Sequence, residues 1–195
     1  MAALNEIAAF LVETAASLYL ILVVVRGMLQ AARADFYNPI SQFVARLTNP
    51  PLQALHRIIP IRSRVDPAVL VLALAVQAIA IVTTLLLAGF ALPGPVTILV
   101  WSLIGVAGLV VNTYLVALIV MIVVSWVAPG TRHPAVLLTY QITEPVMAPV
   151  RSMLPAAGGL DFSPILVFIA INVIQIALRH MAAAAGLPLQ LVIGI

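Results

Sequence analysis

The sequence predicts an all-α integral membrane protein whose four transmembrane helices form two parallel repeats. Hydrophobic residues make up 64% of the 195 positions and charged residues only 8%, with a mean hydropathy of +1.22. Soluble domains carry about 25% charged residues, so the bilayer is the expected solvent. Residues 19–66 also align with residues 114–161, without a gap, at an offset of 95. An internal duplication constrains the architecture before any single residue is interpreted.

Each copy consists of an apolar run, a proline-containing connector that holds most of the charge, and a second apolar run. We expect the first repeat to occupy residues 1–92, and the second residues 93–195 with a short apolar tail. The matched positions are Tyr19 and Tyr114, Pro39 and Pro134, Thr48 and Thr143, Pro50 and Pro145, Pro60 and Pro155, and Asp66 and Asp161.

Four segments are long enough to cross a hydrocarbon core, which needs about 20 helical residues. The expected spans are residues 4–29, 68–90, 97–127 and 164–180. The start of the chain does not resemble a cleavable signal, because it is acidic rather than basic and no cleavage site follows. The tail, residues 186–195, is too short to span and is expected to lie at the interface or to pack on the bundle.

Arginine positions predict the orientation. Arg179 alone lies on the side of the termini. The other eight arginines lie in the two connectors: Arg33, Arg46, Arg57, Arg62 and Arg64 in the first, with Arg26 at its edge, and Arg132 and Arg151 in the second. Because arginine-rich loops stay inside, we expect a multi-pass protein of the inner (plasma) membrane with cytoplasmic connectors and both termini outside. Two spans per copy make the repeats parallel.

The connectors show helical amphipathic spacing. In the first copy, a break at residues 49–51 is expected to separate two apolar stripes, and Pro60 and Pro155 are expected to end the helices. The stripes are Ile40, Phe43, Val44 and Leu47, then Leu52, Leu55, Ile58 and Ile59, and in the second copy Met147, Val150, Met153 and Leu154. We expect these helices to cover the cytoplasmic end of the bundle; the alternative is a surface that binds anionic lipid headgroups or a protein partner.

The second connector reads Thr143-Glu144-Pro145, then Pro149-Val150-Arg151, Leu154-Pro155 and GGLDFSP at 158–164. This order and spacing resembles the signature of the YggT family, also called YlmG-like, over about residues 18–178. The resemblance marks as motif residues Thr143, Glu144, Pro145, Arg151, Pro155 and Asp161, with Asp66 and Arg57 in the first copy. The first copy departs from the signature, because it has Asn49 in place of the acid and His56-Arg57 at the basic position.

The resemblance implies a small integral membrane protein of the kind found in bacteria and plastids, often with two modules in proteobacteria. Similar proteins are linked to osmotic or ion tolerance, to cell-division phenotypes and to haem-cofactor maturation in plastid cytochrome complexes. These are three different functions, and the resemblance does not choose among them.

Asp66 and Asp161 stand just before the second and fourth spans. An Asp at a helix start accepts hydrogen bonds from free backbone N–H groups, so capping is the expected role and a catalytic or ion-binding role the alternative. Ser163 and Pro164 are expected to be the cap and first residue of the fourth span. Glu144 is expected to pair with Arg151 and to fix the turn at Pro145.

Four amides lie inside the expected spans: Gln77, Asn112, Asn172 and Gln175. Gln77 and Asn172 are equivalent positions of the two repeats. Amides in lipid usually bond to a neighbouring helix, so we expect them to hold the spans together; the alternative is a polar path for an ion. Glu13 is an acid inside a span and therefore a functional candidate, although it lies near the outer end.

Other chemistry is excluded or unsupported. The chain has no cysteine, and its three histidines lack metal-ligand spacing. A net charge of +3 in so apolar a chain indicates membrane orientation and no nucleic-acid partner. We therefore expect no metal, no cofactor and no enzymatic activity. The leading hypothesis is support of osmotic or ion homeostasis of the envelope. The alternative is a scaffold or assembly factor that docks a membrane-protein partner, with a homo-oligomer also open.

Overall fold

The computed structural model describes residues 2–60, 66–153, 161–188 and 193–194. In this part of the chain, six helices follow one another: α1 (Ala2–Ala31), α2 (Pro39–His56), α3 (Pro67–Leu87), α4 (Pro95–Val127), α5 (Pro134–Met153) and α6 (Ser163–Ala184). Four of them, α1, α3, α4 and α6, are long and apolar enough to cross a membrane. The predicted all-α class with four spans is confirmed.

Glycines set two helix ends that the sequence analysis misplaced. The second span was expected to reach residue 90, but α3 ends at Leu87 because Gly89 adopts a φ of +75°. The fourth was expected to end at residue 180, but α6 continues to Ala184, where Gly186 adopts a φ of +62°. Glycine reaches this left-handed conformation at little cost, and it allows the last carbonyls of a helix to be satisfied.

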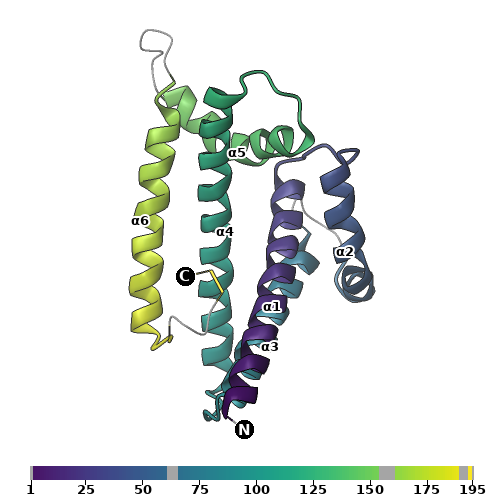
Figure 1. Cartoon of the computed structure of the whole chain (residues 1–195), viewed down its shortest axis with the longest axis vertical. Coiled ribbons are helices and arrows are strands. Elements are labelled where there is room, and N and C mark those ends of the chain that lie inside the picture. The colour runs from purple at the N-terminus through teal and green to yellow at the C-terminus, as the bar shows by residue number, and fades with distance from the viewer. Residues whose placement is uncertain (1, 61–65, 154–160, 189–192, 195) are drawn as a thin grey trace.

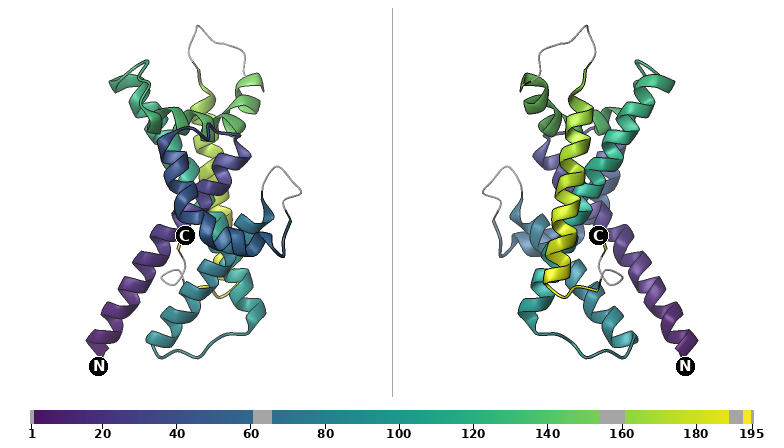
Figure 2. Two further views of the ribbon diagram at one scale, coloured as in Figure 1. Left: turned by 90° about the vertical axis from the view of Figure 1, so that its right-hand side faces the viewer. Right: turned by 90° about the vertical axis from the view of Figure 1, so that its left-hand side faces the viewer.

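The longest helix, α4, lies between the two halves of the molecule. It contacts α1 and α3 of the first repeat and α5 and α6 of the second, and α6 and the α1–α3 pair lie on opposite sides of it (Figure 1). The N-terminal half of α1 diverges from the bundle (Figure 2). Large apolar side chains such as Leu4, Phe10 and Val173 are exposed there and along α6, as lipid-facing positions of a span would be.

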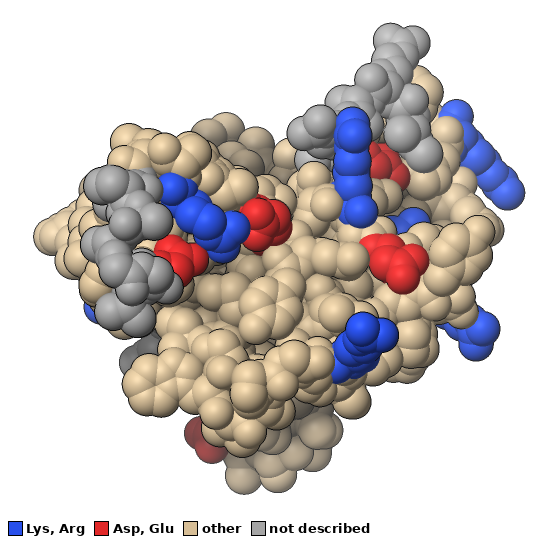
Figure 3. All heavy atoms as spheres, turned by 90° about the horizontal axis from the view of Figure 1, so that it is seen from above, with Lys and Arg blue, Asp and Glu red and all other residues tan. Residues whose placement is uncertain are grey.

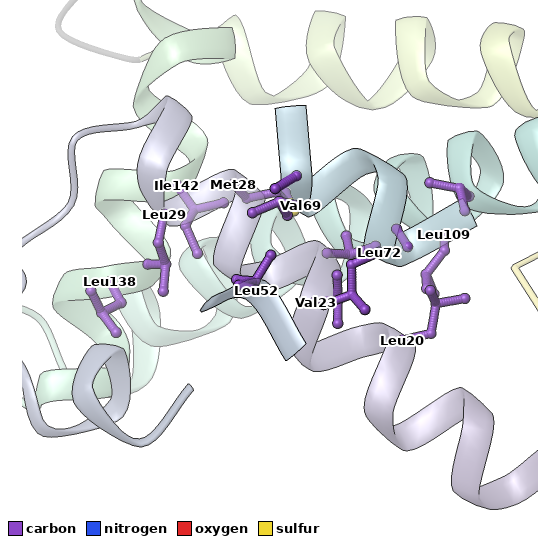
Figure 4. Close-up of a cluster of buried hydrophobic side chains, with 14 residues drawn as sticks. Leu20, Val23, Met28, Leu29, Leu52, Val69, Leu72, Leu109, Leu138 and Ile142 are labelled. Atoms are coloured by element: carbon purple, nitrogen blue, oxygen red, sulfur yellow. The ribbon is translucent and has the colours of Figure 1, made fainter. Parts of the chain in front are cut away.

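The largest buried cluster connects five helices and contains Leu20, Leu52, Leu72, Leu109 and Leu138 among others (Figure 4). A second cluster joins α3, α4 and the residues after α6, and a third joins α4, α5 and α6. Because α2 and α5 contribute to the first and third clusters, both connectors are packed parts of the protein. We call the end of the bundle where they lie the connector end.

The predicted break at residues 49–51 is wrong as a helix boundary. Helix α2 runs through Pro50 and Pro51 to His56, although its ribbon changes direction along its length (Figure 2). Each proline removes one intrahelical donor. Val44 on one side and Leu52 on the other are almost fully buried against the bundle, and this packing holds both parts of the helix in place. Helix α5 similarly contains Pro145 and Pro149.

The buried face of α2 also differs from the predicted stripe. Its buried residues are Ser41, Val44, Ala45, Thr48 and Leu52. Phe43 and Leu47, which were expected on the same face as Val44, are exposed. Apart from Leu52, the side chains that pack on the bundle are small or β-branched, which allows close helix approach, while Phe43 and Leu47 are exposed. The second predicted stripe is cut short, because the helix ends before Ile58, which is exposed.

Candidate functional site

Charged side chains gather at the connector end, where acids and arginines are close neighbours (Figure 3). The described residues form three ion pairs, all of which lie in the connectors or at the start of the following span. Each repeat contributes one cluster at equivalent positions. These two clusters are the candidate functional site.

In the second repeat, Arg151 at the end of α5 contacts two carboxylates. Its Nη1 donates to Oε1 of Glu144 at 3.2 Å, and its Nε donates to Oδ2 of Asp161 at 3.2 Å. The predicted Glu144–Arg151 pair is therefore present, and Asp161 joins it. All three side chains are about half exposed, so solvent screening makes each pair weak by itself. Together they connect α5 to the start of α6.

Asp161 has a second role at the start of α6. Its Oδ1 accepts a hydrogen bond from the backbone N–H of Ser163 at 2.9 Å. Hydrogen bonding from Ser163 lowers the pKa of the Asp161 carboxyl below its ordinary value, and Arg151 lowers it further. Asp161 therefore has the predicted capping contact. Ser163, predicted as the cap itself, is already the first residue of the helix, and Phe162 precedes it as the cap.

In the first repeat, the basic partner is His56 rather than Arg57. Nε2 of His56 lies 2.6 Å from Oδ2 of Asp66, and Oδ1 of Asp66 accepts from the backbone N–H of Ala68 at 2.9 Å. Arg57 is exposed and forms no ion pair with a described residue. The offset of 95 aligns His56 with Arg151, so the repeat alignment contained the signal that the motif comparison missed.

The two clusters differ in burial and in charge. Asp66 is only 2% exposed, whereas the Asp161 side chain is 45% exposed. Asn49 stands where the second repeat has Glu144, so the first cluster has one carboxylate and the second has two. The first cluster is therefore a buried, structural contact, and the second is an accessible one.

The motif residue Thr143 and its first-repeat counterpart are buried inside their helices. Thr143 is 3% exposed and donates to the carbonyl of Thr139 at 2.9 Å, as its first-repeat counterpart Thr48 does to Val44 at 2.8 Å. Such bonds within a helix satisfy a buried hydroxyl. Pro145 lies inside α5, and Pro155 lies outside the described residues.

Two of the four amides connect helices as predicted. Nε2 of Gln175 on α6 donates to Oδ1 of Asn112 on α4 at 2.7 Å. Nδ2 of Asn112 in turn donates to the carbonyl of Gly194 at 2.9 Å. The described part of the tail therefore packs on the bundle, which is one of the two locations expected from the sequence.

The other two amides do not hold helices together. Asn172 is partly buried and donates to the carbonyl of Phe168 in its own helix at 2.8 Å, so its predicted role between helices is wrong. Gln77 is fully buried, and neither its oxygen nor its nitrogen reaches a partner among the described residues. Glu13 is partly exposed on α1 and forms no ion pair with the described part of the chain. Within that same part, no three metal-ligating side chains are grouped.

Gly194→Val is expected to displace the tail from α4. A Cβ at Gly194 would lie 2.6 Å from both the carbonyl oxygen of Gly105 and the backbone nitrogen of Leu109, and the φ of +107° disfavours any side chain. A cysteine introduced at Ile193, in this cysteine-free chain, should then react several-fold faster with a maleimide. Gly94→Val is the matched control, because nothing surrounds Gly94 within 4 Å. Equal rates in all three backgrounds would contradict the observed docking.

Comparisons with known proteins agree with this organisation. The family model described as CCB3/YggT matches residues 5–87 and again residues 100–182. The two matches are related by the same offset of 95 that aligns the repeats. No solved structure matches the chain.

The curated relatives are themselves uncharacterized. The chain is 44% identical to an uncharacterized protein of Pseudomonas aeruginosa over 193 residues, covering 98% of both chains. It is 33% identical over 183 residues to the uncharacterized protein YggT of Escherichia coli K12, covering 91% of this chain and 92% of that one. The family match and the high coverage lead to one conclusion: the chain belongs to the CCB3/YggT family and carries the family's module twice.

Proposed function

We propose that this protein is a non-enzymatic scaffold of the inner membrane, whose connector end faces the cytoplasm and docks a membrane-protein partner. The arginine distribution supports this orientation, since basic loops remain inside. The described amides support a scaffold over a conducting path, because Asn112 and Gln175 are bonded to each other and Asn172 to its own helix.

The observation that carries the proposal is the outer face of α2. Phe43 and Leu47 are exposed apolar side chains, and Arg46 and Arg57 are exposed cations on the same connector. Exposed aromatic and aliphatic anchors beside arginines are typical of protein interfaces. The partner that fits is a membrane protein with an acidic cytoplasmic surface and an apolar groove, and anionic headgroups would screen the same arginines.

Reversing the charge of Arg46 and Arg57 together is expected to abolish docking, because two glutamates would repel an acidic partner. A photoreactive residue at position 43 should give a defined cross-linked product in native membranes with the unaltered arginines. That product should be lost in the Arg46→Glu, Arg57→Glu variant.

Asn172→Leu, a change on α6 away from the connector, is the matched control and should keep the product. A product of unchanged yield in the charge-reversed variant, or no product at all, would contradict the scaffold.

A second candidate function is direct support of osmotic or ion homeostasis, which was the leading hypothesis from the sequence. Two observations favour it: the unpartnered amide of Gln77, and a polar cavity of about 40 Å³ lined by Gly108, Asn112, Gln175, Leu178, Arg179 and Gly194. A role in ion handling requires that deletion alters growth at high osmolarity and that Gln77→Leu with Asn112→Leu reproduces the defect. Normal cation uptake in both strains would exclude it.

A further inference from the structure

A cleft opens at the connector end between α4, α5 and the start of α6, and nothing in the proposed docking of α2 uses it. Its volume is about 410 Å³, within the range of about 300–1,000 Å³ typical of ligand pockets. We call it the second-repeat cleft. It is lined by Met121, Ile122, Ser125, Trp126, Tyr140, Met147, Arg151, Asp161, Pro164 and Ile165.

The cleft is amphiphilic. Met121 and Met147 are 8% and 1% exposed and belong to the buried cluster between α4, α5 and α6, so they form an apolar floor. Flexible methionine side chains adapt to irregular apolar ligands. The polar lining residues are Ser125, Tyr140, Arg151 and Asp161, while Trp126 is 85% exposed. An occupant therefore needs an apolar part and a charged part.

The charged cluster at the cleft has a particular balance. Arg151 and Asp161 line the cleft, and Glu144 adjoins it through its bond to Arg151, so the cluster carries one positive and two negative charges. The described contacts use two of the five N–H donors of the guanidinium. Both carboxylates are about half exposed and keep acceptor capacity. A purely anionic ligand would meet a net negative cluster, whereas a ligand with one phosphate and one ammonium complements it.

The first repeat lacks this set of groups at the equivalent positions. The offset of 95 places Ala31 at Trp126, Ala45 at Tyr140 and Asn49 at Glu144. The remaining acid, Asp66, is 2% exposed and already bonded to His56 and Ala68. A groove does exist beside Gly27, Val69 and Leu70, but its lining is almost entirely apolar. A first-repeat pocket lined by Arg26, Gln30 and Arg33 among others has basic groups but no carboxylate in its lining. The combination of an arginine with an accessible carboxylate is therefore found in the second-repeat cleft.

We propose that the second-repeat cleft binds a zwitterionic phospholipid with an ethanolamine headgroup. Its phosphate meets the Arg151 guanidinium, and its ammonium donates to the carboxylate of Asp161, while Glu144 beside Arg151 adds a second negative charge nearby. Trp126 and Tyr140 present aromatic faces that attract a cation. The first part of the acyl chains lies over Met121, Met147 and Ile165.

Headgroup chemistry predicts the order in which the cleft prefers three phospholipids. A phosphatidylglycerol has the phosphate but no cation for the carboxylates. A phosphatidylcholine keeps the positive charge but cannot donate N–H hydrogen bonds, which are the stronger contacts to a carboxylate. The expected order of binding is ethanolamine, then choline, then glycerol.

Native mass spectrometry of the whole chain, in mild detergent with equal amounts of the three phospholipids, tests this order. We expect one tightly retained lipid per chain, with the ethanolamine form favoured over the glycerol form by about tenfold, the factor that 1.4 kcal/mol supplies. Asp161→Asn keeps the shape and a capping oxygen but removes a charge, so it should reduce this preference several-fold. Trp126→Leu should reduce it as well.

Arg132→Gln, which removes an exposed arginine that does not line the cleft, is the matched control and should bind lipids as the native chain does. Circular dichroism and a single elution peak establish that each variant is folded. Equal retention of the three lipids, or an unchanged preference in both Asp161→Asn and Trp126→Leu, would overturn the proposal. The scaffold function stands or falls separately, since its test alters Arg46 and Arg57.

Discussion

Asp66→Ala is expected to lower the free energy of unfolding by about 3 kcal/mol. Loss of an N-terminal helix cap costs about 1 kcal/mol, and loss of a hydrogen bond to a charged, buried acceptor costs about 1.5–3 kcal/mol. Asp66 is 2% exposed and bonds both His56 and the start of α3. Unfolding by sodium dodecyl sulfate, followed by circular dichroism in mixed micelles, measures the change.

Asp161→Ala is the internal control for this experiment, because it removes the equivalent residue of the second repeat. The Asp161 side chain is 45% exposed, and exposed ion pairs contribute about 0–1 kcal/mol, so we expect a loss of about 1 kcal/mol. Asp66→Asn should fall between the two alanine variants, since asparagine also caps helices. Equal losses in Asp66→Ala and Asp161→Ala would show that burial does not distinguish the two clusters.

Gln77→Leu is expected to raise the free energy of unfolding by about 2 kcal/mol. A buried polar group without a hydrogen-bond partner costs about 1–3 kcal/mol, and leucine removes that cost in a side chain of similar size. Gln77 is fully buried, and both its polar atoms lack a partner among the described residues. The same micelle titration detects the gain.

Asn172→Leu is the matched control, because it makes the same kind of change at the equivalent, only partly buried position of α6. Its amide bonds a carbonyl of its own helix, so we expect a change within about 0.5 kcal/mol. A loss of stability in Gln77→Leu would mean that the amide is bonded in the membrane, as a polar path through the first repeat would require.

Sequence was sufficient for the features that depend on local chemistry. Hydropathy predicted the four spans, because the bilayer requires long uninterrupted apolar helices. The acids before α3 and α6 identified both capping contacts, because free N–H groups at a helix start need an acceptor close in sequence. The Glu144–Arg151 pair could also be predicted from the sequence, because its partners lie on one helix and are only seven positions apart.

Packing decided the features that the sequence analysis missed. His56 rather than Arg57 meets Asp66, because the direction of a side chain depends on where the helix ends and how it lies on α3. The residues 49–51 bend α2 without ending it, since buried contacts on both sides outweigh the lost hydrogen bonds. The outward position of Phe43 likewise follows from which face of α2 fits closely on the bundle.

Gln77 and Asn172 show most clearly what the sequence determined and what the tertiary structure decided. They occupy one position of a duplicated module, and the sequence gives them the same predicted role. Helix α3 packs against α1, α2 and α4, whereas α6 contacts only α4 and α5 among the described helices. Gln77 is therefore fully buried, whereas Asn172 is only partly buried. Repetition and hydropathy determined the helices, but the number of neighbours around each helix decided which polar side chains lost access to the surroundings.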